Sequence, residues 1–119
     1  MSKIDDYAKF VDTTTSRESK SFLAFIDSTS RLEACNDINV ARALTSAIGM
    51  LAESGEYTEI LKKVVFQGKE FNEGERFHMK RELGDILWYW VQGCLALGYT
   101  PDEVMDENIN KLEARYPNG

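Results

Sequence analysis

Four carboxylates recur in two pairs with the same spacing. Glu53 and Glu56 form the first pair, Glu82 and Asp85 the second, and the members of each pair are three residues apart. Residues three apart on a helix lie on one face, so each pair can grip one ion. Sites built only from oxygen ligands suit Mg²⁺, with Mn²⁺ as the alternative, and these ions usually recruit substrate phosphates as well. The spacing therefore predicts that these four residues are both metal ligands and catalytic residues.

The elements that carry the two pairs are expected to place them face to face. Hydrophobic periodicity predicts helices over about residues 40–66 and 73–97, joined by a short turn, and such helices pack antiparallel. Folding the chain back at this turn places Glu56 about as far from the turn as Glu82. Small residues accompany the first pair and leave room for a ligand: Gly49, Ala52 and Gly55. Four facing carboxylates repel one another and resist ionisation unless cations compensate their charge.

The rest of the chain also favours helices. Further helices are expected over about residues 3–12, through 22–26, over 31–34, and from Pro101 to near Tyr116, where Thr100 and Glu103 form a capping box. No polar–apolar alternation is long enough to indicate a sheet. The predicted fold class is all-α, a bundle of about four to five helices in a single domain, 1–119. The expected core positions are Ile4, Tyr7, Ala8, Val11, Leu44, Ile48, Leu51, Thr58, Leu61, Leu83, Leu87, Trp90, Val91, Cys94 and Leu97.

Composition excludes several classes of function. The net charge of −6 argues against a nucleic-acid polymer as partner, because phosphate backbones require a basic surface. The single histidine disfavours a zinc site. No apolar run approaches the length of a membrane span, and the N-terminus has no apolar signal region. With only two, widely separated cysteines, we expect a reducing, cytoplasmic setting, which is the host cytoplasm if a phage encodes the protein.

Several motifs together resemble one known family. They are Gly49-Met-Leu-Ala-Glu53-Ser-Gly-Glu56, Lys62-Lys63, Glu82-Leu-Gly-Asp85-Ile-Leu-Trp-Tyr and Asn108-Ile-Asn-Lys111-Leu-Glu-Ala-Arg115-Tyr-Pro. This combination is similar to the MazG-like nucleotide pyrophosphohydrolases of the all-alpha NTP pyrophosphatase superfamily, in their phage and bacterial single-domain form. The resemblance covers about residues 44–119. It implies hydrolysis of a nucleoside triphosphate to a monophosphate and pyrophosphate, with Mg²⁺ held at the four carboxylate positions.

Five further residues are expected to bind substrate. The resemblance implies this role for Asn108, Lys111 and Arg115. Lys63, with Lys62 beside it, follows the first acidic pair and could face the phosphates as a point charge. Tyr89 shares a helical stripe with Asp85 and could pack near the base or sugar. The alternative for each is an ordinary exposed or core position.

Two rival functions stay open. One is a pyrimidine-specific dUTP or dCTP pyrophosphatase. The other is a non-catalytic helical module whose acidic face binds a basic partner. A di-iron carboxylate bundle would need Glu-x-x-His pairs, which this sequence lacks. Exposed apolar residues and the resemblance both lead us to expect a homodimer or homotetramer, with substrate residues contributed from both chains.

Overall fold

The chain is helical throughout. A computed structural model describes residues 2–119, and over these residues it contains helices and no strand. The helices are α1 (Lys3–Thr14), α2 (Arg17–Lys20), α3 (Phe22–Cys35), α4 (Val40–Gln67), α5 (Glu73–Ala96) and α6 (Pro101–Arg115). The all-α class is confirmed. The six helices within residues 2–119 exceed the predicted four to five, and the short α2 is one that was not predicted. The helices predicted through 22–26 and over 31–34 are instead one continuous helix, α3.

The chain divides into two compact units. The first ends at Asn36 and contains α1 to α3, and the second, Asp37–Gly119, contains α4 to α6. The single domain over 1–119 stays a prediction. Within the first unit, α1 buries none of its residues, so the predicted core face of Ile4, Tyr7, Ala8 and Val11 is wrong for the chain on its own. The predicted site residues all lie in the second unit.

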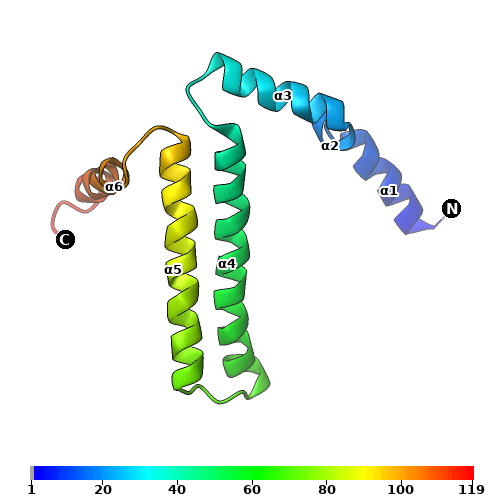
Figure 1. Ribbon diagram of the computed structural model, residues 1–119. Coiled ribbons are helices and arrows are strands. Elements are labelled where there is room, and N and C mark those ends of the chain that lie inside the picture. Colours follow the sequence, from blue (N-terminus) through cyan, green and yellow to red (C-terminus); the bar gives the residue numbers. More distant parts are fainter. Residues whose placement is uncertain (1) are drawn as a thin grey trace. The chain divides into compact units, whose positions relative to one another are not determined.

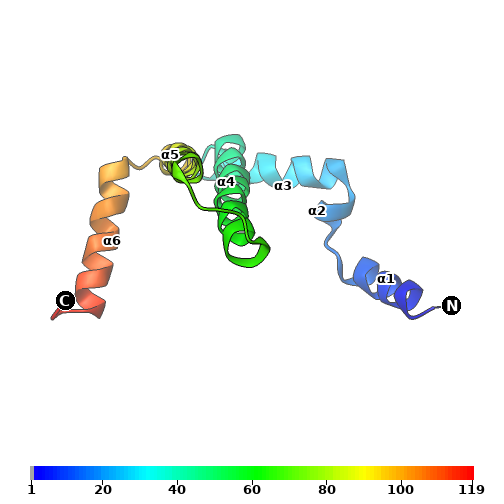
Figure 2. The same ribbon diagram turned by 90° about the horizontal axis from the view of Figure 1, so that it is seen from below.

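An antiparallel pair of long helices, α4 and α5, dominates the second unit (Figures 1 and 2). The turn between them begins at Gly68, whose φ of 70° is a left-handed conformation that glycine adopts without strain. Asn72 then caps α5 by accepting from the backbone N–H of Glu75 at 3.2 Å. At the far end, the backbone N–H of Asn39 donates to the carbonyl of Ala96 at 2.9 Å. The pair is therefore fixed at both ends.

Two glycines let α4 and α5 approach closely. The ring of Tyr89 lies against the Cα of Gly49, where any side-chain carbon would collide with it. A Cβ added at Gly93 would come within 2.6 Å of the Ser46 hydroxyl oxygen. Arg42 Nε also donates to Gln92 Oε1 across the pair at 2.6 Å. Small and polar residues therefore take part in the contact between the two helices, beside the buried Ile60 of α4.

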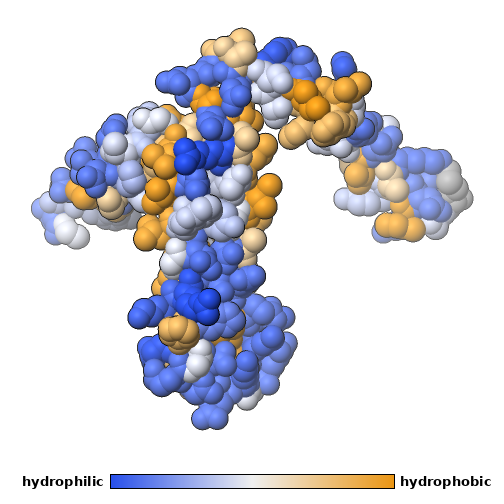
Figure 3. Space-filling model, in the orientation of Figure 1, coloured by the Kyte–Doolittle hydropathy of each residue, from blue (hydrophilic) through white to orange (hydrophobic). Residues whose placement is uncertain are grey.

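The most apolar stripes of α4 and α5 do not form the contact between these helices. Leu51 is 77% exposed and Leu87 is 57% exposed, so their predicted place in the core is wrong for the chain on its own. The same correction applies to Leu44, Ile48, Leu61, Leu83 and Leu97, which are exposed, and to Thr58. Cys94 is buried as predicted, and Trp90 and Val91 are half-buried. Figure 3 shows hydrophobic side chains along the sides of the upper half of the pair, and hydrophilic ones over its lower half toward the turn.

The last helix begins as its sequence predicts. Thr100 and Glu103 form the reciprocal capping box, with Pro101 in the first turn of α6. Within residues 2–119, no helix has both the length and the apolar character needed to cross a membrane.

Candidate metal centre

Three carboxylates from α4 and α5 converge on one point. Glu53, Glu82 and Asp85 each offer an oxygen atom, and these three atoms all lie within 4.8 Å of one another. Glu82 is only 5% exposed, Glu53 is half-buried, and Asp85 faces solvent. The antiparallel register predicted from the short turn thus does bring the two acidic pairs together. We call these three residues the carboxylate cluster.

The buried oxygens of the carboxylate cluster lack partners. Glu53 Oε2 and Glu82 Oε2 are both buried without a hydrogen-bond partner among the described residues. Two ionised carboxylates can only accept hydrogen bonds, so a proton on Glu53 is needed before its side chain can donate to Glu82. This contact with Glu82, together with burial and the neighbouring charge of Glu56, raises the pKa of Glu53 from an ordinary 4.5 to about 7.

A divalent cation fits this arrangement better than a proton does. Buried, unpartnered carboxylate oxygens are costly, and a cation coordinated by both would satisfy them at once. The donor set contains only oxygen, which suits Mg²⁺ or Mn²⁺. Groups of exposed acids often hold no ion, but here one member of the cluster is buried on the helix contact. Glu53, Glu82 and Asp85 are therefore able to hold such an ion together.

Glu56 and His78 border the carboxylate cluster on the side of the turn. Glu56 is exposed, one helical turn after Glu53, and contributes to the raised pKa of Glu53. His78 lies one turn before Glu82, and its Nε2 is 3.2 Å from Glu82 Oε1. That contact occupies one oxygen of Glu82, while the other, Oε2, is buried without a hydrogen-bond partner among the described residues. His78 thus contacts the most buried carboxylate of the cluster and contributes to its orientation.

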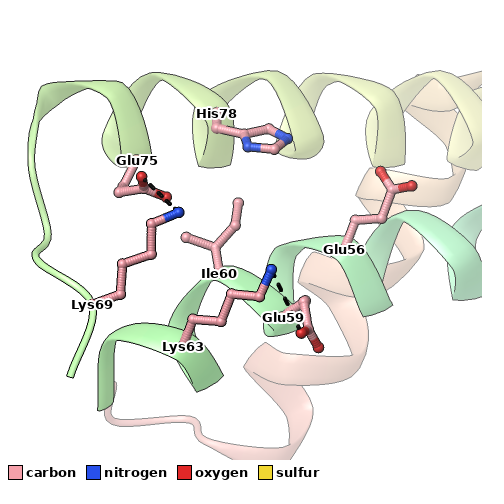
Figure 4. A pocket seen from close by; sticks show the side chains of 7 residues that line it. All are labelled: Glu56, Glu59, Ile60, Lys63, Lys69, Glu75 and His78. Atoms are coloured by element: carbon pink, nitrogen blue, oxygen red, sulfur yellow. Dashed lines mark ion pairs between the residues drawn. The ribbon is translucent and has the colours of Figure 1, made fainter. Parts of the chain in front are cut away.

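A pocket of about 270 Å³ opens beyond Glu56 and His78, toward the turn (Figure 4). We call it the turn pocket; its remaining lining residues are Glu59, Ile60, Lys63, Lys69 and Glu75. Lys69 Nζ lies 3.2 Å from Glu75 Oε1, and Lys63 Nζ lies 3.9 Å from Glu59 Oε1. The structure thus places the predicted Lys63 in a pocket next to the carboxylates, whereas Lys62 does not line it.

A second cavity, of about 330 Å³, lies on the other side of the carboxylate cluster. It is lined by Glu53, Asp85, Trp88 and Tyr89, and we call it the aromatic cavity. The rings of Trp88 and Tyr89 meet edge to face, with centroids 5.0 Å apart. Tyr89 is the predicted substrate residue that the structure brings into contact with this space.

The predicted residues of α6 lie elsewhere. Asn108 lines a cavity with Trp90, Val104, Met105 and Ile109, while Lys111 and Arg115 are exposed. Within residues 2–119, neither the turn pocket nor the aromatic cavity is lined by any of these three. Within one chain, Asn108, Lys111 and Arg115 therefore do not line either space beside the carboxylate cluster.

Two charged residues of the turn pocket, Lys69 and Glu75, are not among the predicted site residues. Their ion pair depends on the left-handed Gly68, which turns the chain so that Lys69 points back over the first turn of α5. The sequence does contain a signal for this ion pair, because Lys69 lies just before the predicted start of the helix over 73–97 and Glu75 lies just after it.

The part of the chain that carries the carboxylate cluster matches a known protein family. The family model described as the MazG nucleotide pyrophosphohydrolase domain matches residues 43–119. The Gene 37 protein of Mycobacterium phage L5 is 31% identical over 74 residues. That match covers 60% of this chain and 64% of the phage protein, which is just under two thirds of the relative's length. No solved structure is significantly similar to this chain.

Proposed function

The chain belongs to the MazG nucleotide pyrophosphohydrolase family, and we propose that it hydrolyses a nucleoside triphosphate between the α- and β-phosphates. In this reaction, water attacks the α-phosphorus, and the bond from that phosphorus to the bridging oxygen breaks. The electron pair leaves with pyrophosphate, and the proton of the water passes to a carboxylate. The products are a nucleoside monophosphate and pyrophosphate.

The observation that carries this proposal is the convergence of Glu53, Glu82 and Asp85 within 4.8 Å, with two buried oxygens that lack partners. We propose that these residues hold Mg²⁺, with Mn²⁺ as a substitute. The bound ion would neutralise phosphate charge and make the attacking water more acidic. The α4–α5 contact contributes rigidity, because residues on packed helices hold a site more precisely than residues on loops.

Glu56 has one of two roles in this proposal. It either completes the metal ligands from the exposed side or accepts the proton of the attacking water. The substitution Glu56→Gln separates the two. A ligand role predicts weaker Mg²⁺ binding, whereas a base role predicts a fall in kcat with Mg²⁺ affinity unchanged.

The direct test is product identification across the ribo- and deoxyribonucleoside triphosphates by phosphorus NMR. We expect monophosphate and pyrophosphate, with turnover that requires Mg²⁺ or Mn²⁺. Release of orthophosphate, or no metal-dependent turnover with any nucleotide, would contradict the proposal. Turnover of dUTP or dCTP alone would support the pyrimidine-specific alternative.

We also propose that the active protein is a homodimer or a larger assembly in the cytoplasm, of the host if a phage encodes it. Exposed apolar stripes on α4 and α5 need a partner surface. We propose that α6 of one copy lies at the site of the other, which would bring Asn108, Lys111 and Arg115 to the nucleotide. Mixing the inactive variants Lys111→Ala and Asp85→Asn should restore part of the activity if sites are shared in this way.

A further inference from the structure

The carboxylate cluster has chemically different surroundings on its two sides. The turn pocket carries lysines, and the aromatic cavity carries Trp88 and Tyr89. We propose that the turn pocket is the subsite for the β- and γ-phosphates, which depart as pyrophosphate, and that Lys63 and Lys69 bind them. The inference rests on the proposed function. It adds a direction: the nucleotide lies along the α4–α5 pair with its phosphate end toward the turn.

Position supports this assignment first. Glu56 and His78 line the turn pocket and also contact members of the carboxylate cluster, so the pocket opens directly from the predicted metal site. Lys63 lies two helical turns beyond Glu56. Side chains on a helix lean toward its N-terminus, so Lys63 extends back toward the carboxylates. Its contact with Glu59, one turn earlier, shows this direction (Figure 4).

Lys63 and Lys69 also have hydrogen-bond donors that no contact within residues 2–119 uses. An ammonium group carries three hydrogen-bond donors, and each of these two lysines makes one ion pair. The side chains of Lys63 and its partner Glu59 are both 47% exposed, so this ion pair contributes little stability and rearranges at little cost. The Lys69 side chain is 51% exposed, whereas its partner Glu75 is only 14% exposed, so the second ion pair is partly buried. The unused donors of both ammonium groups can therefore bind phosphate oxygens while Glu59 and Glu75 hold the lysines at the pocket.

Charge in the turn pocket predicts how pyrophosphate binds. Three glutamates, Glu56, Glu59 and Glu75, outnumber the two lysines. A bare polyanion would be repelled by this excess, whereas pyrophosphate accompanied by a divalent cation would not. Binding should therefore require Mg²⁺. The aromatic cavity offers no cationic side chain, so it suits the base or sugar rather than the phosphate chain.

The experiment compares four lysine variants of the full chain, one of which, Lys63→Arg, keeps the positive charge. Lys63→Met and Lys69→Met remove one ammonium each from the turn pocket. Lys62→Met is the matched control, because Lys62 pairs with the same Glu59 at 3.2 Å but does not line the pocket. Calorimetry measures binding of magnesium pyrophosphate and of the nucleoside monophosphate, and steady-state kinetics gives the product-inhibition constant of each.

We expect Lys63→Met and Lys69→Met to bind magnesium pyrophosphate about tenfold to a hundredfold more weakly, with monophosphate binding unchanged. Lys62→Met should bind both like the wild type, and Lys63→Arg should recover most of the lost affinity. Unchanged pyrophosphate affinity in both pocket variants, or equal loss of both products, would overturn the subsite. A wild type that releases no pyrophosphate from any nucleotide would instead refute the proposed function, and calorimetry would still decide the subsite.

Discussion

Glu53 is the residue whose chemistry the fold changes most. Its pKa of about 7 arises because Glu82 and Glu56 oppose its ionisation and burial withholds water from Oε2. Below about pH 7, Glu53 is therefore protonated in the metal-free protein, and a cation that binds there must displace this proton. Such a crowding of negative charge is expected at a site that binds a positive ion.

The proton on Glu53 makes the stability of the metal-free protein depend on pH. The unfolded chain ionises this carboxyl near 4.5, while the folded chain keeps the proton until about pH 7. Between these values the folded state binds more protons, so stability falls as pH rises through this window and then levels off. Chemical denaturation in a chelator between pH 5 and 8 measures the slope. Glu53→Gln should remove this component of the slope, and an identical slope in that variant would contradict the assignment.

Glu82→Gln separates catalysis from stability. The amide removes one negative charge and can donate to Glu53, so the metal-free variant should unfold at a higher temperature, with a gain of about 1 kcal/mol. Its metal-dependent turnover should fall at least about a hundredfold. Thermal unfolding and a pyrophosphate-release assay measure the two effects. An acidic interaction module predicts the same gain in stability with no turnover to lose.

At the scale of the element, the close approach of α4 and α5 depends on two glycines. The ring of Tyr89 occupies the space where Gly49 lacks a side chain, and the Ser46 hydroxyl does the same at Gly93. The close approach that results lets short carboxylate side chains from both helices meet. The packing of these two helices is thus part of the site.

Gly49→Ala tests the role of this packing. The added methyl collides with the Tyr89 ring, and overpacking of this kind costs about 1–3 kcal/mol of unfolding free energy. The matched control is Gly55→Ala on the same helix, where no atom lies within 4 Å of an added Cβ. The control should gain about 0.5–1 kcal/mol, because alanine is the better helix former. Equal effects of the two substitutions on urea denaturation would contradict the account.

Local sequence signals predict where these elements begin and end but not which faces pack. The bounds of α4 and the capping box of α6 follow from residues within one turn, and the structure confirms both. The packing face of α4 could not be found this way. Hydrophobic periodicity marks the stripe that contains Leu51, whereas the face toward α5 carries Ser46, Gly49 and Glu53. Register across the turn did predict the meeting of the acidic pairs, because it depends only on the turn being short.

At the scale of the molecule, α4 and α5 expose stripes of large apolar side chains, which a monomeric protein would normally bury. Ile48, Leu51, Leu83 and Leu87 are each more than half exposed. A second copy of the chain would cover such stripes, and identical chains associate by presenting the same surface to one another. The resulting four-helix arrangement would place two carboxylate clusters in one particle.

Leu51→Glu should dissociate this assembly. Light scattering of the wild type should give at least twice the chain mass of 13.5 kDa, and the variant should give a smaller particle. Burial of two leucines in a symmetric interface makes the dissociation constant rise at least about a hundredfold on substitution. Leu51→Met keeps the apolar volume and should remain associated. A monomeric wild type would contradict the shared-site proposal.

The proposed function requires α4 and α5 to hold a divalent cation between them. Titration of Mn²⁺ into the protein, followed by the EPR signal of the free ion, tests this claim most directly, with Glu53→Gln changing α4 and Asp85→Asn changing α5. We expect the wild type to bind Mn²⁺ and each variant alone to bind it at least about tenfold more weakly, because both helices contribute ligands to the same ion. Wild-type affinity in either variant, or no binding by the wild type, would contradict the claim.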